Sequence, residues 1–196
     1  MGLGVFLGGY MTEKQKMLSG DYYNHYDKEL TEERATIAEK LATYNTFSSD
    51  EEKKLFLGNM LGKIGKDVEI KTPFMCDYGY NIELGSNVFI NYNCTILDCN
   101  KVKIGNNVLM APNVQIYAAT HPTDYKLRLQ ELEMAYPIII EDNVWIGGGT
   151  IICPGVTIGK NSVIGAGSVV VKDIPANSLA VGNPCIVVKK LEDCDE

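Results

Sequence analysis

The feature that most constrains this chain is a six-residue period in its aliphatic residues. Between residues 140 and 170 an isoleucine or valine recurs at every sixth position: Ile140, Ile146, Ile152, Ile158, Ile164 and Val170. The residue four positions after each of the first five is small or β-branched: Val144, Thr150, Val156, Ser162 and Ser168. The same phase is found upstream, with two-residue slips between blocks, at Ile64, Ile70, Leu84, Ile90, Ile96, Ile104, Met110 and Ile116.

A period of six excludes a simple strand and a helix, whose side-chain periods are 2 and 3.6 residues. It is typical of a chain that turns a corner every six residues. Each aliphatic side chain then points into a narrow interior, and small residues occupy the tight bends. Three sides close one coil of about 18 residues, and stacked coils pair as parallel strands about 4.8 Å apart. The sequence therefore predicts a mainly β protein, with a parallel β-helix over residues 63–182.

Residues 11–62 show helical spacing instead. Thr12 to Gln15 has the form of a capping box, and Gly20 follows it as a stop signal. Thr31, followed by two acidic residues, predicts the start of a second helix, and Ser49 predicts a third. Three short helices bury little alone, so we expect them to form a cap over one end of the β-helix. Residues 1–10 and 183–196 are predicted to be tails, and the chain from Pro175 onward is expected to run back along a side.

Charge and composition exclude several classes of function. Lys plus Arg number 18 against 25 Asp plus Glu, which gives a net charge of −7. An acidic surface repels phosphate backbones, so we expect no nucleic-acid partner. The apolar segment 1–10 is far shorter than the ~20 residues of a membrane span, so no membrane partner is expected either. The six cysteines lack CxxC spacing, which favours reduced thiols in a cytoplasmic protein.

The hexapeptide phase has one long interruption, between Ile116 and Ile140. Residues 120–137 are polar and include two prolines, so we predict a loop extruded from a corner of a coil. His121, one of two histidines in the chain, lies at the root of this loop. An imidazole titrates near neutral pH and can act as a general base. The alternative is a structural histidine next to a turn proline.

Several segments carry a family resemblance. The run from Ile140 to Gly159, with Glu141 in place of the first glycine, resembles the hexapeptide-repeat acyltransferases. More narrowly, the maltose/galactoside O-acetyltransferases are similar to this chain at residues 11–18, 118–122, 161–168 and 182–185. This resemblance covers residues 11 to 191. It implies a left-handed parallel β-helix and a homotrimer with active sites between subunits. It also implies acetyl-CoA as the donor, a small sugar as the acceptor, His121 as the catalytic base, and no metal.

The resemblance also implies binding roles for individual residues. Sugar contacts carry over to Asp77 and Asp98, whose alternative role is to accept backbone donors in turns, and to Arg34 in the cap. Glu133 is expected to orient His121, with a solvated loop acid as the alternative. Trp145 either walls the acceptor pocket or is a structural residue of its coil. Contacts with acetyl-CoA carry over to Asn91, Gly148, Ala166, Val171, Lys172 and Lys189.

The chain departs from the family pattern at two places. Some relatives have an arginine after the cysteine of Gly-x-Pro-Cys, where this chain has Ile186, so one phosphate contact is missing. An aspartate that contacts the substrate in some members aligns near Asn24 or His25. The identity of the sugar therefore stays open.

A β-helix supports several functions, so the fold alone does not decide between them. A zinc-dependent carbonic anhydrase needs about three histidine ligands, and this chain has only His25 and His121. A xenobiotic or antibiotic acetyltransferase shares the histidine on a loop but generally lacks a helical cap. A non-catalytic scaffold would need neither acetyl-CoA nor a loop that bears a histidine. We therefore expect a sugar O-acetyltransferase.

Overall fold

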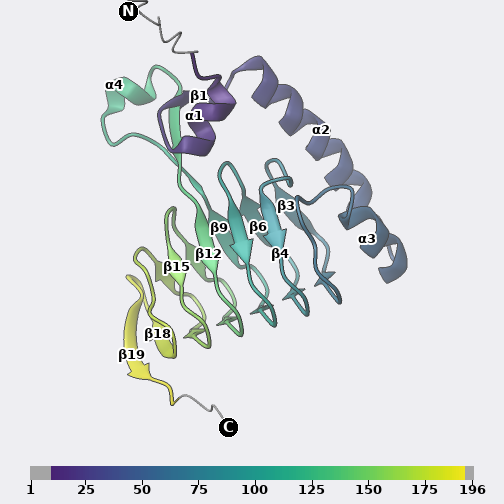
Figure 1. The fold of residues 1–196 in the computed structure, drawn as a ribbon, viewed down its shortest axis with the longest axis vertical. Helices are drawn as coiled ribbons and strands as arrows, with labels where there is room; N and C mark the ends of the chain where they lie inside the picture. The colour runs from purple at the N-terminus through teal and green to yellow at the C-terminus, as the bar shows by residue number, and fades with distance from the viewer. Residues whose placement is uncertain (1–9, 193–196) are drawn as a thin grey trace, which may run out of the picture.

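Three parallel sheets form the three sides of a β-helix in the computed structural model, which describes residues 10–192 (Figure 1). The four-stranded sheet contains β4 (Ile82–Leu84), β7 (Val102–Ile104), β12 (Ile138–Ile140) and β15 (Thr157–Ile158). The five-stranded sheet contains β3 (Phe74–Cys76), β6 (Cys94–Leu97), β9 (Gln115–Tyr117), β14 (Ile151–Ile152) and β17 (Val169–Val170). The predictions for residues 1–9 and for Cys194 lie outside the described residues.

The seven-stranded sheet forms the third side and includes the end of the chain. It contains β2 (Glu69–Ile70), β5 (Phe89–Ile90), β8 (Leu109–Met110), β13 (Trp145–Ile146), β16 (Val163–Ile164), β18 (Ser178–Val181) and β19 (Ile186–Lys190). Strand β18 is parallel to β16, whereas β19 is antiparallel to β18. The expectation that the chain runs back from Pro175 is therefore correct only for β19, because β18 first adds one more parallel strand to the stack.

The aliphatic residues of the six-residue period form the core. From Ile70 to Val170 each of them is at most 3% exposed, and only Ile64, at the beginning, is half-buried. The register explains the two-residue slips in the period. Phe89 lies opposite Leu109, a step of 20 residues, whereas Trp145 lies opposite Val163, a step of 18. The early coils are therefore two residues longer than the late ones.

A ladder of asparagines runs along the corner that follows the four-stranded sheet. Asn87, Asn107, Asn143 and Asn161 all have positive φ, between 55° and 61°. The side-chain N–H of each one donates a hydrogen bond to the side-chain Oδ1 of the next, and Asn161 donates in the same way to Asn177. The distances are 2.8 to 3.0 Å. Asparagine tolerates the left-handed conformation that this turn needs, and its amide bonds across the coils. The ladder therefore fixes the spacing and the turn together.

The N-terminal helices begin and end largely where their capping residues predict. The capping box at Thr12 is formed and Gly20, with a φ of 83°, ends α1 (Glu13–Ser19). Ser49 is the N-cap of α3 (Asp50–Leu57). The predicted start at Thr31 is wrong, because α2 (Lys28–Tyr44) begins four residues earlier with Asp27 as its N-cap. The Thr31 hydroxyl instead donates to the Asp27 carbonyl inside the helix.

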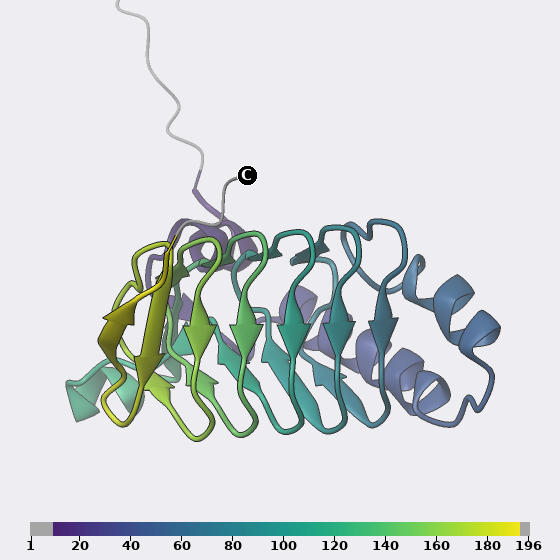
Figure 2. The ribbon, with the colours of Figure 1, turned by 90° about the horizontal axis from the view of Figure 1, so that it is seen from below.

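Helices α2 and α3 lie against the first coils, at the opposite end of the solenoid from β19 (Figures 1 and 2). The Tyr44 hydroxyl donates to the Ile70 carbonyl over 2.8 Å, and Asn45 bonds both the N–H and the carbonyl of Phe74. These bonds satisfy backbone groups next to β2 and β3 that have no preceding coil as a neighbour. The cap therefore covers the end of the β-helix, as predicted.

The segment 120–137 leaves the coil as predicted but has secondary structure of its own. It contains α4 (Tyr125–Arg128) and β11 (Leu132–Ala135), which is antiparallel to β10 (Ala119–Thr120). On its other side β11 pairs with β1 (Tyr23–Asn24) from the N-terminal region. The extruded segment is thus bound to the cap by a three-stranded sheet.

We expect Asn143→Ala to lower the free energy of unfolding by about 2 kcal/mol, because it removes two ladder hydrogen bonds and strains a left-handed position. Asn143→Gly should lose about half as much, since glycine accepts a positive φ without strain. Urea unfolding at a fixed protein concentration measures both variants. Equal losses for the two would contradict the conformational part of this argument.

Candidate active site

A pocket of about 360 Å³ lies at the corner between the five-stranded and four-stranded sheets, where the extruded segment leaves its coil. Four residues predicted for the site line it: Arg34, Asp77, His121 and Glu133. They come from α2, from two coil corners and from β11, so they are far apart in the sequence. The fold therefore brings together the predicted base, its predicted orienting acid and two predicted sugar contacts.

Glu133 lines this pocket, and its side chain is 16% exposed. Its Oε2 accepts a hydrogen bond of 2.7 Å from the Tyr23 hydroxyl. Its Oε1 lies 3.6 Å from Nε2 of His121 and also 3.6 Å from Nδ1 of His25. The pairing of β1 with β11 puts Tyr23 directly opposite Glu133, which explains how the carboxylate is held.

His121 follows β10 directly, and its side chain is 57% exposed, so the ring is open to a ligand. The carboxylate of Glu133 faces its Nε2 and favours a proton on that nitrogen, which leaves Nδ1 as the basic one. A histidine with one nitrogen against a carboxylate and the ring exposed is arranged for proton transfer.

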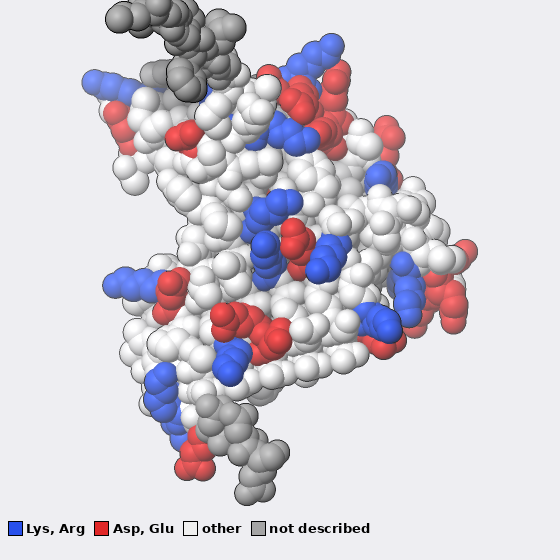
Figure 3. All heavy atoms as spheres, viewed as in Figure 1, with Lys and Arg blue, Asp and Glu red and all other residues white. Residues whose placement is uncertain are grey.

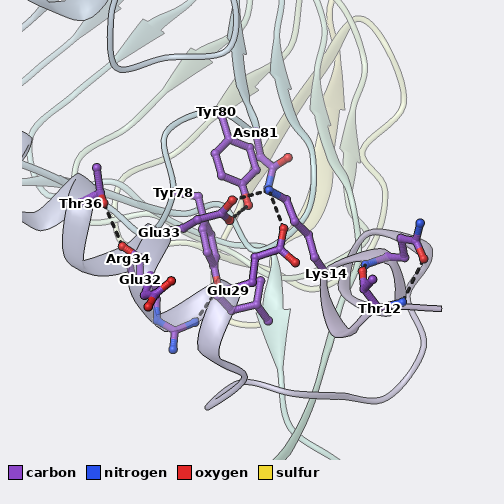
Figure 4. Close-up of polar contacts among 12 residues, drawn as sticks. Thr12, Lys14, Glu29, Glu32, Glu33, Arg34, Thr36, Tyr78, Tyr80 and Asn81 are labelled. Carbon is purple, nitrogen blue, oxygen red and sulfur yellow. Dashed lines mark hydrogen bonds and ion pairs between the residues drawn. The ribbon is translucent and has the colours of Figure 1, made fainter. Parts of the chain in front are cut away.

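Arg34 is anchored at the wall of the pocket by two hydrogen bonds. Its guanidinium donates to the Tyr78 hydroxyl over 2.6 Å and to the His25 carbonyl over 2.5 Å. Figure 4 shows the contact with Tyr78, together with the neighbouring network in which Lys14 contacts Glu29 and Glu33. The bonds of Arg34 tie the cap to the coil corner and to the segment around His25.

Asp77 and Asp98 have different environments. Asp77 lines the pocket and accepts a hydrogen bond of 3.3 Å from the Cys99 thiol. Burial raises the pKa of the Asp77 carboxyl, whereas the Cys99 hydrogen bond and the Arg34 charge oppose that rise. Asp98 has no exposed surface, and its carboxylate accepts from the backbone N–H groups of Asp77, Tyr78 and Asn81.

A direct sugar contact by Asp98 does not fit this burial. In the structure Asp98 holds the corner on which Asp77 lies. This is the alternative role given above, in which a turn aspartate accepts backbone donors. The next residue, Cys99, reaches the pocket in its place. Burial raises the pKa of the Asp98 carboxyl to about 6, in spite of its three backbone hydrogen bonds.

The residues predicted to contact acetyl-CoA lie elsewhere on the β-helix. Asn91, Gly148 and Ala166 occupy the corner between the seven-stranded and five-stranded sheets, across the five-stranded sheet from the pocket. Val171 and Lys172 follow β17, and Lys189 is part of β19. Trp145 lies on the outside of the seven-stranded sheet, 53% exposed, and not in the pocket of its own chain. A single chain does not bring the two predicted groups together.

Six residues that line the pocket were not assigned from the sequence: His25, Leu97, Cys99, Tyr117, Ala119 and Thr120. Tyr23, which holds Glu133, was not assigned either. The only signal for His25 was its position near a departure from the family pattern. Two larger hollows, of about 620 Å³ against α2 and about 510 Å³ along the four-stranded sheet, have no histidine in their lining. Pocket size alone would therefore not have located the proton-transfer groups.

The charges on the face seen in Figure 3 are mixed, with basic and acidic side chains interspersed. Within residues 10–192 no group of three or more His, Cys, Asp or Glu side chains is arranged to hold a metal ion. None of the helices in that range is long and apolar enough to cross a membrane. The five cysteines in that range are free thiols.

A hexapeptide β-helix with a histidine on an extruded segment defines the class of hexapeptide-repeat acyltransferases. Family models match the chain at residues 16–65, as the maltose acetyltransferase hexapeptide capping motif, and at residues 137–172, as the bacterial transferase hexapeptide. A maltose O-acetyltransferase from Clostridium difficile 630 is 51% identical, with a TM-score of 0.92 over 94% of this chain and 100% of that one.

Two further solved structures are similar over nearly the whole chain. A galactoside acetyltransferase in complex with coenzyme A is 38% identical, with a TM-score of 0.91 over 95% of this chain and 94% of that one. A hexapeptide-repeat acetyltransferase from Vibrio cholerae, complexed with acetyl coenzyme A, is 36% identical, with a TM-score of 0.87 over 93% and 100%. The chain belongs to the maltose and galactoside acetyltransferase family of hexapeptide-repeat acetyltransferases.

The raised pKa of Asp98 predicts a pH dependence of stability. Between about pH 4 and pH 6 the folded protein binds this proton more tightly than the unfolded chain does, so stability falls as pH rises through that range. The contribution is on the order of 3 kcal/mol. Asp98→Asn, which does not titrate, should lose this component. Urea unfolding of both proteins at pH 4, 5, 6 and 7 measures it, and parallel pH profiles would contradict the assignment.

Proposed function

We propose that the protein transfers the acetyl group of acetyl-CoA to a hydroxyl of a small sugar, of the maltose, glucose or galactoside type, with His121 as general base. The observation that carries this proposal is the contact of Glu133 with His121 in a pocket that also holds Asp77 and Arg34. The sugar-named relatives and the two coenzyme complexes support the same reaction.

In the proposed step the sugar oxygen attacks the thioester carbonyl while Nδ1 of His121 takes the hydroxyl proton. A tetrahedral oxyanion forms, for which a backbone N–H of an adjacent coil is the expected donor. The intermediate then collapses, the C–S bond breaks, and the imidazolium returns its proton to the departing thiolate of CoA. Glu133 stabilises the imidazolium between these events and holds the ring tautomer through Nε2. Neither a protein nucleophile nor a metal is needed.

The acceptor is held by groups that match vicinal hydroxyls. Asp77 offers carboxylate oxygens, and Arg34 offers N–H donors in the same pocket. The pocket volume of about 360 Å³ falls in the range of small-molecule sites, roughly 300–1,000 Å³. These features favour a compact polyol over a large apolar compound, which is why we place the sugar ahead of a xenobiotic acceptor.

The donor site requires a second copy of the chain in this proposal. Asn91, Gly148 and Ala166 lie across the five-stranded sheet from His121, so the acetyl-CoA groove of one subunit would meet the His121 pocket of a neighbour. Small residues would let the pantetheine arm approach the backbone, and Lys172 and Lys189 would bind its phosphates. We propose a homotrimer with active sites between subunits, located in the cytoplasm.

We expect His121→Ala to reduce turnover with the sugar by a factor of about 100 or more while the fold is retained. The measurement is CoA release from acetyl-CoA with maltose, glucose, a thiogalactoside and chloramphenicol as acceptors. Sugar-dependent release that is lost in the variant supports the proposal. Release with chloramphenicol alone would move the protein to the xenobiotic group. If no acceptor gives CoA release and CoA does not stabilise the protein against heat, the result would favour a scaffold.

The shared site predicts complementation between two inactive variants. Asn91→Ala and His121→Ala subunits, co-expressed with different tags and purified as mixed trimers, should recover about one third of wild-type activity, because one interface in three is intact. Trimers of either single variant are the controls. Mixed trimers that stay inactive would show that both residues act within one chain.

A further inference from the structure

Both histidines of the chain face the same carboxylate oxygen. Oε1 of Glu133 lies 3.6 Å from Nε2 of His121 and 3.6 Å from Nδ1 of His25. The two imidazole rings are edge to face, with their centroids 6.5 Å apart. The other oxygen of Glu133 is occupied by the Tyr23 hydroxyl. One carboxylate oxygen therefore serves two groups that each become cationic when protonated.

His25 is held firmly in this position. Its Nδ1 lies 2.9 Å from the Glu131 carbonyl, and because a carbonyl oxygen only accepts, that nitrogen carries a proton. In the neutral ring Nε2 is then the free basic nitrogen, and the next proton makes the ring a cation. The carbonyl of His25 accepts from Arg34, and Tyr26 packs on the ring at 4.1 Å, so the segment is fixed on both sides.

We propose that His25 is a positioning residue that competes with His121 for Glu133, so that its protonation weakens His121 as a base. The inference rests on the proposed role of His121. While His25 is neutral, the charge of Glu133 is available to stabilise the imidazolium that His121 forms during the reaction. Once His25 is protonated, it shares that charge and repels a proton on His121. The protonation of His121, and with it the loss of activity on acidification, would then depend on the charge of His25.

The other ionisable groups around His25 either keep a constant charge over this pH range or act on both histidine rings. They come from several elements: Arg34 from α2, Tyr26 next in the chain, Tyr23 from β1, Glu13 from α1, Glu133 from β11, and Asp77 and Cys99 from the coil corners. Arg34 is a permanent cation, and burial raises the pKa of the Cys99 thiol, so neither titrates in this range. Asp77 lines the same pocket as both rings. A difference between wild type and a His25 variant therefore reports on His25 itself.

The test is an NMR titration of the whole protein labelled with ¹³C-histidine, in which the two histidines give two ring signals. In wild type we expect each curve to deviate from a single-proton curve. In His25→Asn and His25→Gln the midpoint of His121 should move to higher pH by about half a unit, as expected for a charge 6.5 Å away in water. Tyr26→Phe is the matched control and should leave the midpoint of His121 in place.

The titration is independent of the acceptor, so it separates the two proposals. If the midpoint of His121 is the same in wild type and in both His25 variants, the inference is overturned whether or not the protein acetylates sugars. If the rings are coupled but no sugar is acetylated, the inference about the pair holds and the proposed function fails. With an active enzyme, the midpoint of the acid limb of kcat/KM should move to higher pH by about half a unit in His25→Gln, together with the midpoint of His121.

Discussion

The coils of this protein bond their backbones to the coils on either side, with the cap in place of a coil at the first one, and the rest of the structure depends on that requirement. This requirement forces the three sides to stay in register. The buried aliphatic rows and the asparagine ladder together keep that register. Because the corners repeat in space as well as in sequence, a residue on a corner is positioned by the whole stack. Functional groups on corners therefore need little local support of their own.

The cap has a second role besides covering the first coil. Through β1 it supplies Tyr23, which holds Glu133, and His25, which shares the same carboxylate. Through α2 it supplies Arg34, which bonds the carbonyl of His25 and the hydroxyl of Tyr78. The extruded segment would have no partner for β11 on its outer edge without β1. The cap and the extruded segment thus form one unit around the proposed base.

The six-residue period predicted the core and also, less directly, the place of the site. Its interruptions fall between Cys76 and Leu84, between Ile96 and Ile104, and between Ile116 and Ile140, all at the corner between the five-stranded and four-stranded sheets. The pocket is built from that corner. The period could not predict which side chains turn outward there, because a widened corner has no fixed alternation, and Cys99 rather than Asp98 reaches the pocket.

The contact between Tyr23 and Glu133 joins residues 110 positions apart, and no local pattern indicates it. The same limit explains why the predicted helix start at Thr31 is wrong. Asp27 and Thr31 are both good capping residues, and only packing decides between them. Apart from Lys189 on β19, the residues proposed for the donor lie on corners that the stack fixes, whereas the acceptor pocket is built from widened corners and the cap. Changes of sequence on the widened corners and the cap can therefore alter the acceptor side while the β-helix and the donor side stay unchanged.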